Sequence, residues 1–120
     1  MRSELLTSIL SDLNGSSADI EASAIISTEG LMIASLLAVN MDEERVGAMS
    51  AAMLSLGERT ASELERGELE QVLVKGKQGY ILMSHANSDS VLTVIVKPSA
   101  RLGLIFLDVN RAAEAISKIL

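Results

Sequence analysis

Three strand-like runs, separated only by short breaks, constrain the fold more than any other feature of this sequence. The runs are ELEQVLVK (68–75), GYILMSH (79–85) and SVLTVIVK (90–97). The breaks, residues 76–78 and 86–89, are rich in residues that favour turns, so the runs predict an antiparallel meander. The third run is apolar on both faces and is expected at the centre of a sheet, whereas the first is polar at its start and is expected near an edge.

The chain before this meander predicts a helix and a hairpin. Apolar residues at helical spacing follow Ser3, a possible N-cap, and Asn14-Gly15 supplies a stop. Their positions are Leu6, Ile9, Leu10 and Leu13. From Ile20 the apolar residues recur with a period near two, against Glu21, Ser23 and Ser27, as on a half-buried strand. The turn Thr28-Glu29-Gly30 then leads into a second strand at 31–36.

Two further helices complete the pattern. Residues 42–66 are expected to form a long helix that is acidic in its first turn and closed by Gly67. The last helix is expected to be capped by Ser99, after Pro98 ends the sheet. The order α-β-β-α-β-β-β-α predicts an α+β fold, a single domain over residues 1–120 with one five-stranded antiparallel sheet and helices on both faces.

The long helix carries more apolar surface than a helix lying on one sheet needs. One arc is expected to meet the protein's own sheet and holds Val46, Met49, Met53, Leu56, Thr60 and Leu64. A flank beside it holds Gly47, Ala51, Leu54, Gly57 and Ala61. The opposite side, where solvent is expected, has Ala48, Ala52 and Ser55 before Arg59.

This excess of apolar surface predicts a second protein chain. Leaving one leucine in water forgoes about 1.5–3 kcal/mol, a noticeable share of the stability of a domain. We expect a two-fold dimer in which two such helices pack side by side and the edge strand at 68–75 pairs with its copy. The outer side of the helix then remains for a third protein.

Composition excludes several classes of function. The net charge of −6 and the single Tyr and single Phe argue against binding to nucleic acid. The longest uncharged windows have twelve residues, 30–41 and 46–57, whereas a membrane-spanning helix needs about 20. The chain has no cysteine, and its start, MRSELLTSIL, has no leader-like cleavage site, so we expect a cytoplasmic protein.

The only histidine, His85, stands between Ser84 and Asp89 and invites comparison with a Ser-His-Asp triad. Adjacent residues of a strand point to opposite faces, so Ser84 is not expected to reach His85, and a polar hairpin turn is the better interpretation. A hydrolase would lose activity on His85→Ala, and we expect that change to be nearly silent.

Other polar groups also fail to form a recognisable site. The acids at 42–44 lack the calcium-loop pattern, and residues 75–79 lack the helix that a phosphate loop requires, so neither a metal nor a cofactor is expected. Arg45 and Arg59 could act as arginine fingers on a nucleotide-hydrolysing partner, but solvated helix arginines that pair with glutamate are favoured. The sequence therefore predicts no catalytic residues.

Three segments resemble the Roadblock family, the dynein light-chain relatives that include bacterial MglB-like proteins. They are EASAIISTEGLMIAS (21–35), GAMSAAMLSLGERTASELERGELEQVLVKGKQGYILM (47–83) and LTVIVKPSARLGLIFLDVNRAAEAI (92–116). The resemblance implies a profilin- and longin-like fold, a homodimer joined through the long helix and the third strand, and binding to Ras-like small GTPases. In MglB-like members the dimer stimulates GTP hydrolysis without donating a finger residue.

We therefore expect a non-enzymatic dimeric regulator or scaffold of a Ras-like small GTPase. The residues expected to face the GTPase are Arg45, Ala48, Ala52, Ser55 and Arg59. Those expected at the dimer interface are Gly47, Ala51, Leu54, Leu69, Gln71, Val72, Leu73 and Val74. The alternative is a small-molecule sensor or an adaptor without a GTPase partner, although the strands offer few buried polar groups besides Thr93 and Tyr80.

Overall fold

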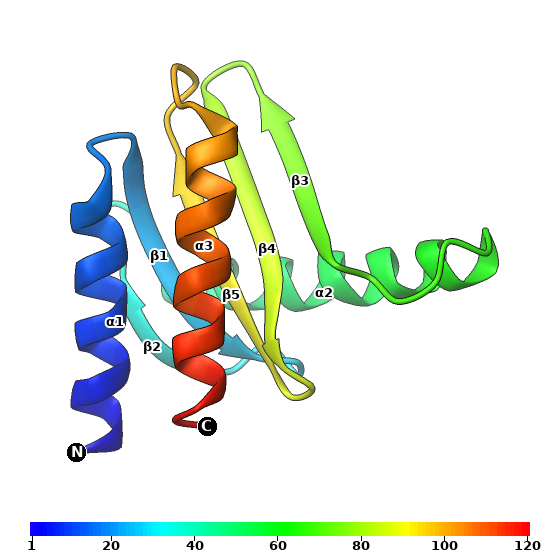
Figure 1. Ribbon diagram of the computed structural model, residues 1–120, viewed down its shortest axis with the longest axis horizontal. Coiled ribbons are helices and arrows are strands. Elements are labelled where there is room, and N and C mark those ends of the chain that lie inside the picture. Colours follow the sequence, from blue (N-terminus) through cyan, green and yellow to red (C-terminus); the bar gives the residue numbers. More distant parts are fainter.

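The computed structural model describes residues 1–120 as three helices packed on a five-stranded sheet (Figure 1). The elements are α1 (Arg2–Ser16), β1 (Ile20–Ser27), β2 (Met32–Leu36), α2 (Glu43–Glu63), β3 (Gln71–Gly76), β4 (Gly79–Asn87), β5 (Ser90–Val96) and α3 (Leu102–Ser117). The strand order is β2-β1-β5-β4-β3 and every neighbouring pair is antiparallel. The α+β class, the element order, the central place of β5 and the edge position of β3 are confirmed.

The helices lie on both faces of the sheet. α1 and α3 lie side by side on one face, and α2 crosses the other (Figure 1). The main hydrophobic core fills the space between the sheet and the α1–α3 pair, with Leu10, Ile25, Leu92 and Ile116 fully buried in it. None of the helices is both long and apolar enough to cross a membrane.

β1 is buried on both faces, which corrects the expectation of a half-buried strand. Its residues from Ala22 to Ile26 are all buried because helices cover the sheet above and below. The hydroxyl of Ser23 is accommodated in this environment because it donates a hydrogen bond of 2.6 Å to the side-chain carbonyl of Asn14.

The predicted caps of the outer helices are wrong. α1 begins at Arg2 and runs to Ser16, because Asn14 directs its side chain to Ser23 and to the Leu36 carbonyl instead of ending the helix. α3 begins at Leu102 without a side-chain cap, since residues 97–100 form a turn in which the Ala100 N–H donates to the Lys97 carbonyl.

Candidate functional site

α2 crosses its face of the sheet alone, and its start is fixed by two polar contacts. The side chain of Asp42 accepts a hydrogen bond of 2.9 Å from the Glu44 N–H and caps the helix. The hydroxyl of Ser35 on β2 donates to the Glu43 carboxylate at 2.7 Å. From there α2 runs across the sheet toward β3, and its C-terminal half projects beyond that strand (Figure 1).

The side of α2 that meets the sheet consists of small residues and one leucine. A Cβ atom built on Gly47 would lie 2.5 Å from the Gly30 carbonyl oxygen, so only glycine permits this approach to the β1–β2 turn. One turn later, Ser50 accepts a hydrogen bond of 2.8 Å from the Thr93 hydroxyl, and both residues are buried. Leu54 is only 1% exposed and packs in a small cluster with Met83 and Val91.

This arrangement corrects the predicted roles of two faces of the helix. Gly47 and Leu54, predicted to lie at the dimer interface, are buried within the subunit, and Ala51 is half-buried beside Gly30. The physical reason is that a helix lying close to its own sheet needs small residues as much as a helix lying close to a second helix does.

The arc that was expected to meet the sheet is largely exposed instead. Met49 is 61% exposed, Leu56 is 58% exposed and Leu64, just after the helix, is 65% exposed. Thr60 is exposed as well, while Val46 and Met53 are half-buried at the border of the arc. The excess of apolar surface predicted for this helix is therefore present, but on a different face from the one assigned to it.

The residues predicted to face a GTPase form a third, outer face of α2. Arg45, Ala48, Ala52, Ser55 and Arg59 are all exposed. Arg59 forms an ion pair of 3.3 Å with Glu63, one turn further along the same helix. This is the pairing expected of a solvated helix arginine.

β3 forms one border of the sheet and carries the remaining residues predicted at the dimer interface. Its pairing with β4 is regular from Gln71 to Gly76. Leu73 is 41% exposed, whereas Val72 is half-buried beneath α2, close to Gly57. Leu69, just before the strand, also packs close to Gly57.

α2 leaves part of its own sheet face uncovered. Near the β3–β4 turn, a shallow groove of about 250 Å³ is lined by Val74, Ile81 and Ile95 among other residues. Ile81 is 37% exposed although β4 is an interior strand of the sheet. Ile81 and Ile95 were not among the predicted interface residues, because alternation along a strand does not show how much of a face one helix covers.

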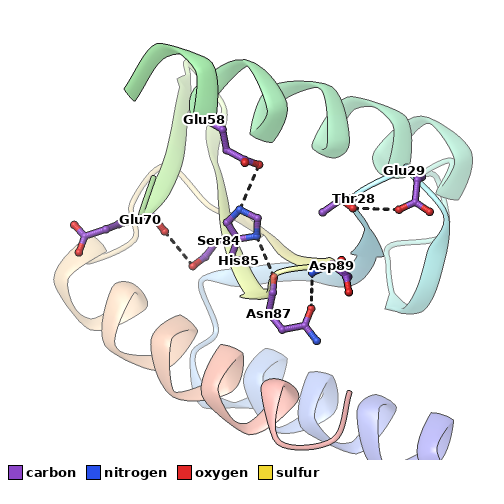
Figure 2. Close-up of polar contacts among 8 residues, drawn as sticks. All are labelled: Thr28, Glu29, Glu58, Glu70, Ser84, His85, Asn87 and Asp89. Carbon is purple, nitrogen blue, oxygen red and sulfur yellow. Dashed lines mark hydrogen bonds and ion pairs between the residues drawn. The ribbon is translucent and has the colours of Figure 1, made fainter. Parts of the chain in front are cut away.

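His85 does not take part in a catalytic triad (Figure 2). Ser84 donates a hydrogen bond of 3.4 Å to the Glu70 carbonyl, while the His85 ring lies between Glu58 of α2 and the Asn87 carbonyl. Asp89 uses its backbone N–H to bind the Asn87 side chain. The prediction that these residues serve structure around a hairpin turn agrees with these contacts.

The largest hollow in the surface lies beside His85, but its lining is not that of a small-molecule site. It measures about 870 Å³, is open to solvent, and has Leu69 as the one hydrophobic residue among nine. Ligand pockets are mostly apolar and enclose the ligand. No three His, Asp or Glu side chains converge to hold a metal ion. The geometry thus gives no support to the small-molecule sensor.

Comparisons with known proteins agree with this architecture. The family model described as "Roadblock/LC7 domain" matches residues 6–96. The chain is 38% identical to uncharacterized protein MJ1340 of Methanocaldococcus jannaschii over 112 residues, which is 93% of this chain and 96% of the relative. Among solved structures, the gliding protein MglB from Thermus thermophilus has a TM-score of 0.86 at 17% identity, with 98% of this chain and 90% of that chain covered. MglB from Myxococcus xanthus has a TM-score of 0.89 at 20% identity, with 97% and 87% covered.

Proposed function

Because this chain belongs to the Roadblock/LC7 family, we propose that it forms a homodimer that binds and regulates a Ras-like small GTPase. The observation that carries the proposal is the exposed apolar arc of α2, a helix whose C-terminal half projects beyond the subunit's own sheet (Figure 1). Such a surface is costly in water and is covered when a second chain binds.

The two borders of the sheet differ in their capacity to bind another strand. β2 is short and carries a bulge: Ile25 pairs with Ala34 and Ile26 pairs with Met32, so Ile33 is an extra residue. Bulges and short edge strands are devices that prevent pairing with another chain. β3 is regular over its whole length and lies next to the uncovered groove, which supports β3 as the edge that pairs with a second copy.

A two-fold axis perpendicular to the sheet, placed beside the middle of β3, would cover both the apolar arc of α2 and the groove near the β3–β4 turn. The axis reverses the direction of the partner's strand, as antiparallel pairing requires, and extends the sheet. It also brings the projecting half of the partner's α2 over the groove of Val74, Ile81 and Ile95. The apolar arc with Met49 and Leu56 then faces the same arc of the partner.

In this dimer the outer face of α2 remains free for the GTPase. That face lies roughly opposite the buried side with Gly47 and Leu54, at about 100° of rotation per residue. We propose that Arg45, Ala48, Ala52, Ser55 and Arg59 contact the GTPase. The mechanism is differential binding, in which a surface that fits the hydrolysis-competent arrangement better shifts the GTPase toward it.

The dimer is tested by its mass in solution. Sedimentation of the wild-type protein should give twice the monomer mass of 12.7 kDa. Leu73→Lys places two like charges at the centre of the strand pair and should weaken the dimer by about 100-fold or more. Leu107→Lys on α3 changes a residue of similar exposure and should leave the dimer intact. A wild-type monomer at all concentrations would contradict the proposed dimer.

The GTPase is tested with the small GTPases encoded nearest to the gene. Titration calorimetry should detect binding to one of them, and Ala52→Tyr should abolish it while the dimer persists. Ser11→Tyr, on the exposed side of α1, is the matched control and should bind normally. Binding to none of these GTPases would count against a GTPase partner, and normal binding by Ala52→Tyr would contradict the assignment of the outer face.

Arg59 allows regulation without a finger residue to be distinguished from catalysis by an arginine finger. We expect Arg59→Ala to weaken binding but to leave the single-turnover hydrolysis rate of the saturated complex within about threefold. Loss of a true arginine finger lowers that rate by about 10³–10⁵-fold. A loss of that size would make Arg59 a catalytic group.

A further inference from the structure

His85 forms the only ion pair that joins two different elements of the fold. Its Nε2 atom lies 3.3 Å from Glu58 Oε1, so it links β4 to α2. The other ion pairs, Arg59–Glu63, Arg111–Asp108 and Lys118–Glu114, each lie within one helix or at its end. His85 is also the single histidine of the chain, and histidine is the side chain that ordinarily changes its charge between about pH 5 and 8.

Both ring nitrogens of His85 face oxygen atoms that can only accept hydrogen bonds. Nδ1 lies 3.1 Å from the Asn87 carbonyl, on the opposite side of the ring from Glu58 (Figure 2). A neutral imidazole has one N–H group and can satisfy one of these acceptors, whereas an imidazolium has two and satisfies both. Both acceptors therefore receive a hydrogen bond only when the ring carries a positive charge.

The charged residues that line the hollow beside His85 are all acidic. Glu58 comes from α2, Glu65 and Glu68 come from the connection after α2, and the β4–β5 turn adds Ser88, which is uncharged. No lysine or arginine lines the hollow. The hollow therefore offers the ring hydrogen-bond acceptors and no competing cation.

We propose that His85 is a proton-operated latch between the projecting half of α2 and the β4–β5 hairpin. The charged ring bridges Glu58 and Asn87 and holds this half of the helix against the sheet. Loss of the proton leaves one of the two acceptors without a donor and opens that contact. The latch does not depend on the proposed dimer or GTPase, although it would act on the helix that both are proposed to contact.

Hydrogen exchange tests the latch directly. After correction for intrinsic rates, we expect amides of residues 57–64 to exchange about two- to fivefold more slowly at pH 6 than at pH 8, relative to amides of β5. A partly exposed ion pair is expected to slow local opening by about this factor. Glu58→Gln and His85→Gln should both remove the difference between the two pH values.

Matched variants separate the latch from other causes. Glu63→Gln removes a charge from the same helix but leaves His85 untouched, so its pH difference should equal that of the wild type. Leu73→Lys should keep the pH difference even if it disrupts the proposed dimer. A wild-type protein without the difference, a difference that survives Glu58→Gln, or one that disappears in Glu63→Gln or Leu73→Lys would overturn the proposal.

Discussion

Gly47 lies where α2 and the β1–β2 turn come closest, and its replacement tests how tightly the helix is seated. Gly47→Ala improves helix propensity by about 1 kcal/mol, but its methyl group would meet the Gly30 carbonyl, and overpacking of this kind costs about 1–3 kcal/mol. We expect a net loss of about 1 kcal/mol in the free energy of unfolding, measured in urea at fixed protein concentration.

Gly15→Ala in α1 is the control for that substitution. Apart from its chain neighbours and the backbone of its own helix, no atom lies within 4 Å of the added Cβ, so the change should stabilise the protein by about 0.5–1 kcal/mol. A Gly47→Ala protein that gained as much stability would contradict the close approach.

The buried hydroxyls of Ser50 and Thr93 form the polar contact between the middle of α2 and the central strand. Ser50→Ala removes the acceptor for the Thr93 hydroxyl and should cost about 1–3 kcal/mol of unfolding free energy. Adding Thr93→Val removes the stranded donor as well and should recover most of that loss. Equal and additive losses in urea denaturation would show that the two hydroxyls act independently.

Glu65 occupies a position after α2 that favours glycine. Its φ of 59° lies in the left-handed region, which costs a residue with a side chain about 1–2 kcal/mol. Since glycine loses more entropy on folding, we expect Glu65→Gly to raise the unfolding free energy by only about 0.5–1 kcal/mol. Gly67→Ala, with φ of 85° in the same connection, should lower it. A lower unfolding free energy for Glu65→Gly, or a higher one for Gly67→Ala, in thermal or urea unfolding would contradict this account.

At the scale of the element, α2 shows which part of the site could be predicted from sequence and which could not. The helix, its start near Asp42 and its excess of apolar surface followed from spacing and charge. The assignment of faces did not, because Met49 and Leu56 look like core residues and Gly47 looks like a contact with a second helix. Periodicity shows which residues share a face of the helix. Which of these faces packs against the sheet depends on how closely the helix approaches it.

β3 offers a direct test of how two subunits pair. An axis perpendicular to the sheet keeps each face on its own side, so a residue can only oppose one that points to the same face. If the axis passes midway between the two copies of Leu73, these residues oppose each other at a Cα distance of about 4.5–5.5 Å, which suits a disulfide. The chain has no cysteine of its own, so Leu73→Cys should give one covalent dimer on mild oxidation, detected by non-reducing electrophoresis.

Leu107→Cys is the control for this cross-link, because it places an exposed thiol on α3, away from the β3 border. It should stay largely monomeric under the same oxidation. Cross-linking of both variants to the same extent would show random collision instead of strand pairing.

At the scale of the whole molecule, the sequence predicted the sheet well and the coverage of the sheet poorly. Short turns and strand-like runs were sufficient for the order of elements, the central place of β5 and the border position of β3. The burial of Ser23 and the exposure of Ile81 depend on where the helices lie over the sheet. That placement arises from packing between distant segments, which local patterns do not encode.

The proposed dimer also predicts how the whole protein unfolds. If folding and association are coupled, the apparent unfolding free energy of the wild type should rise with protein concentration. Leu73→Lys should show no such dependence and Leu107→Lys should behave like the wild type, as measured by urea denaturation at several concentrations. If the apparent unfolding free energy of the wild type did not change with protein concentration, folding would not be coupled to association.

The bulge at Ile33 has a consequence for the size of any assembly built by strand addition. A sheet that accepts neighbours at both borders can grow into a fibril without limit, whereas one with a single receptive border is complete after one addition. The irregular first hairpin thus closes one border of the sheet to further strands, and the proposed pairing through β3 would stop at two copies.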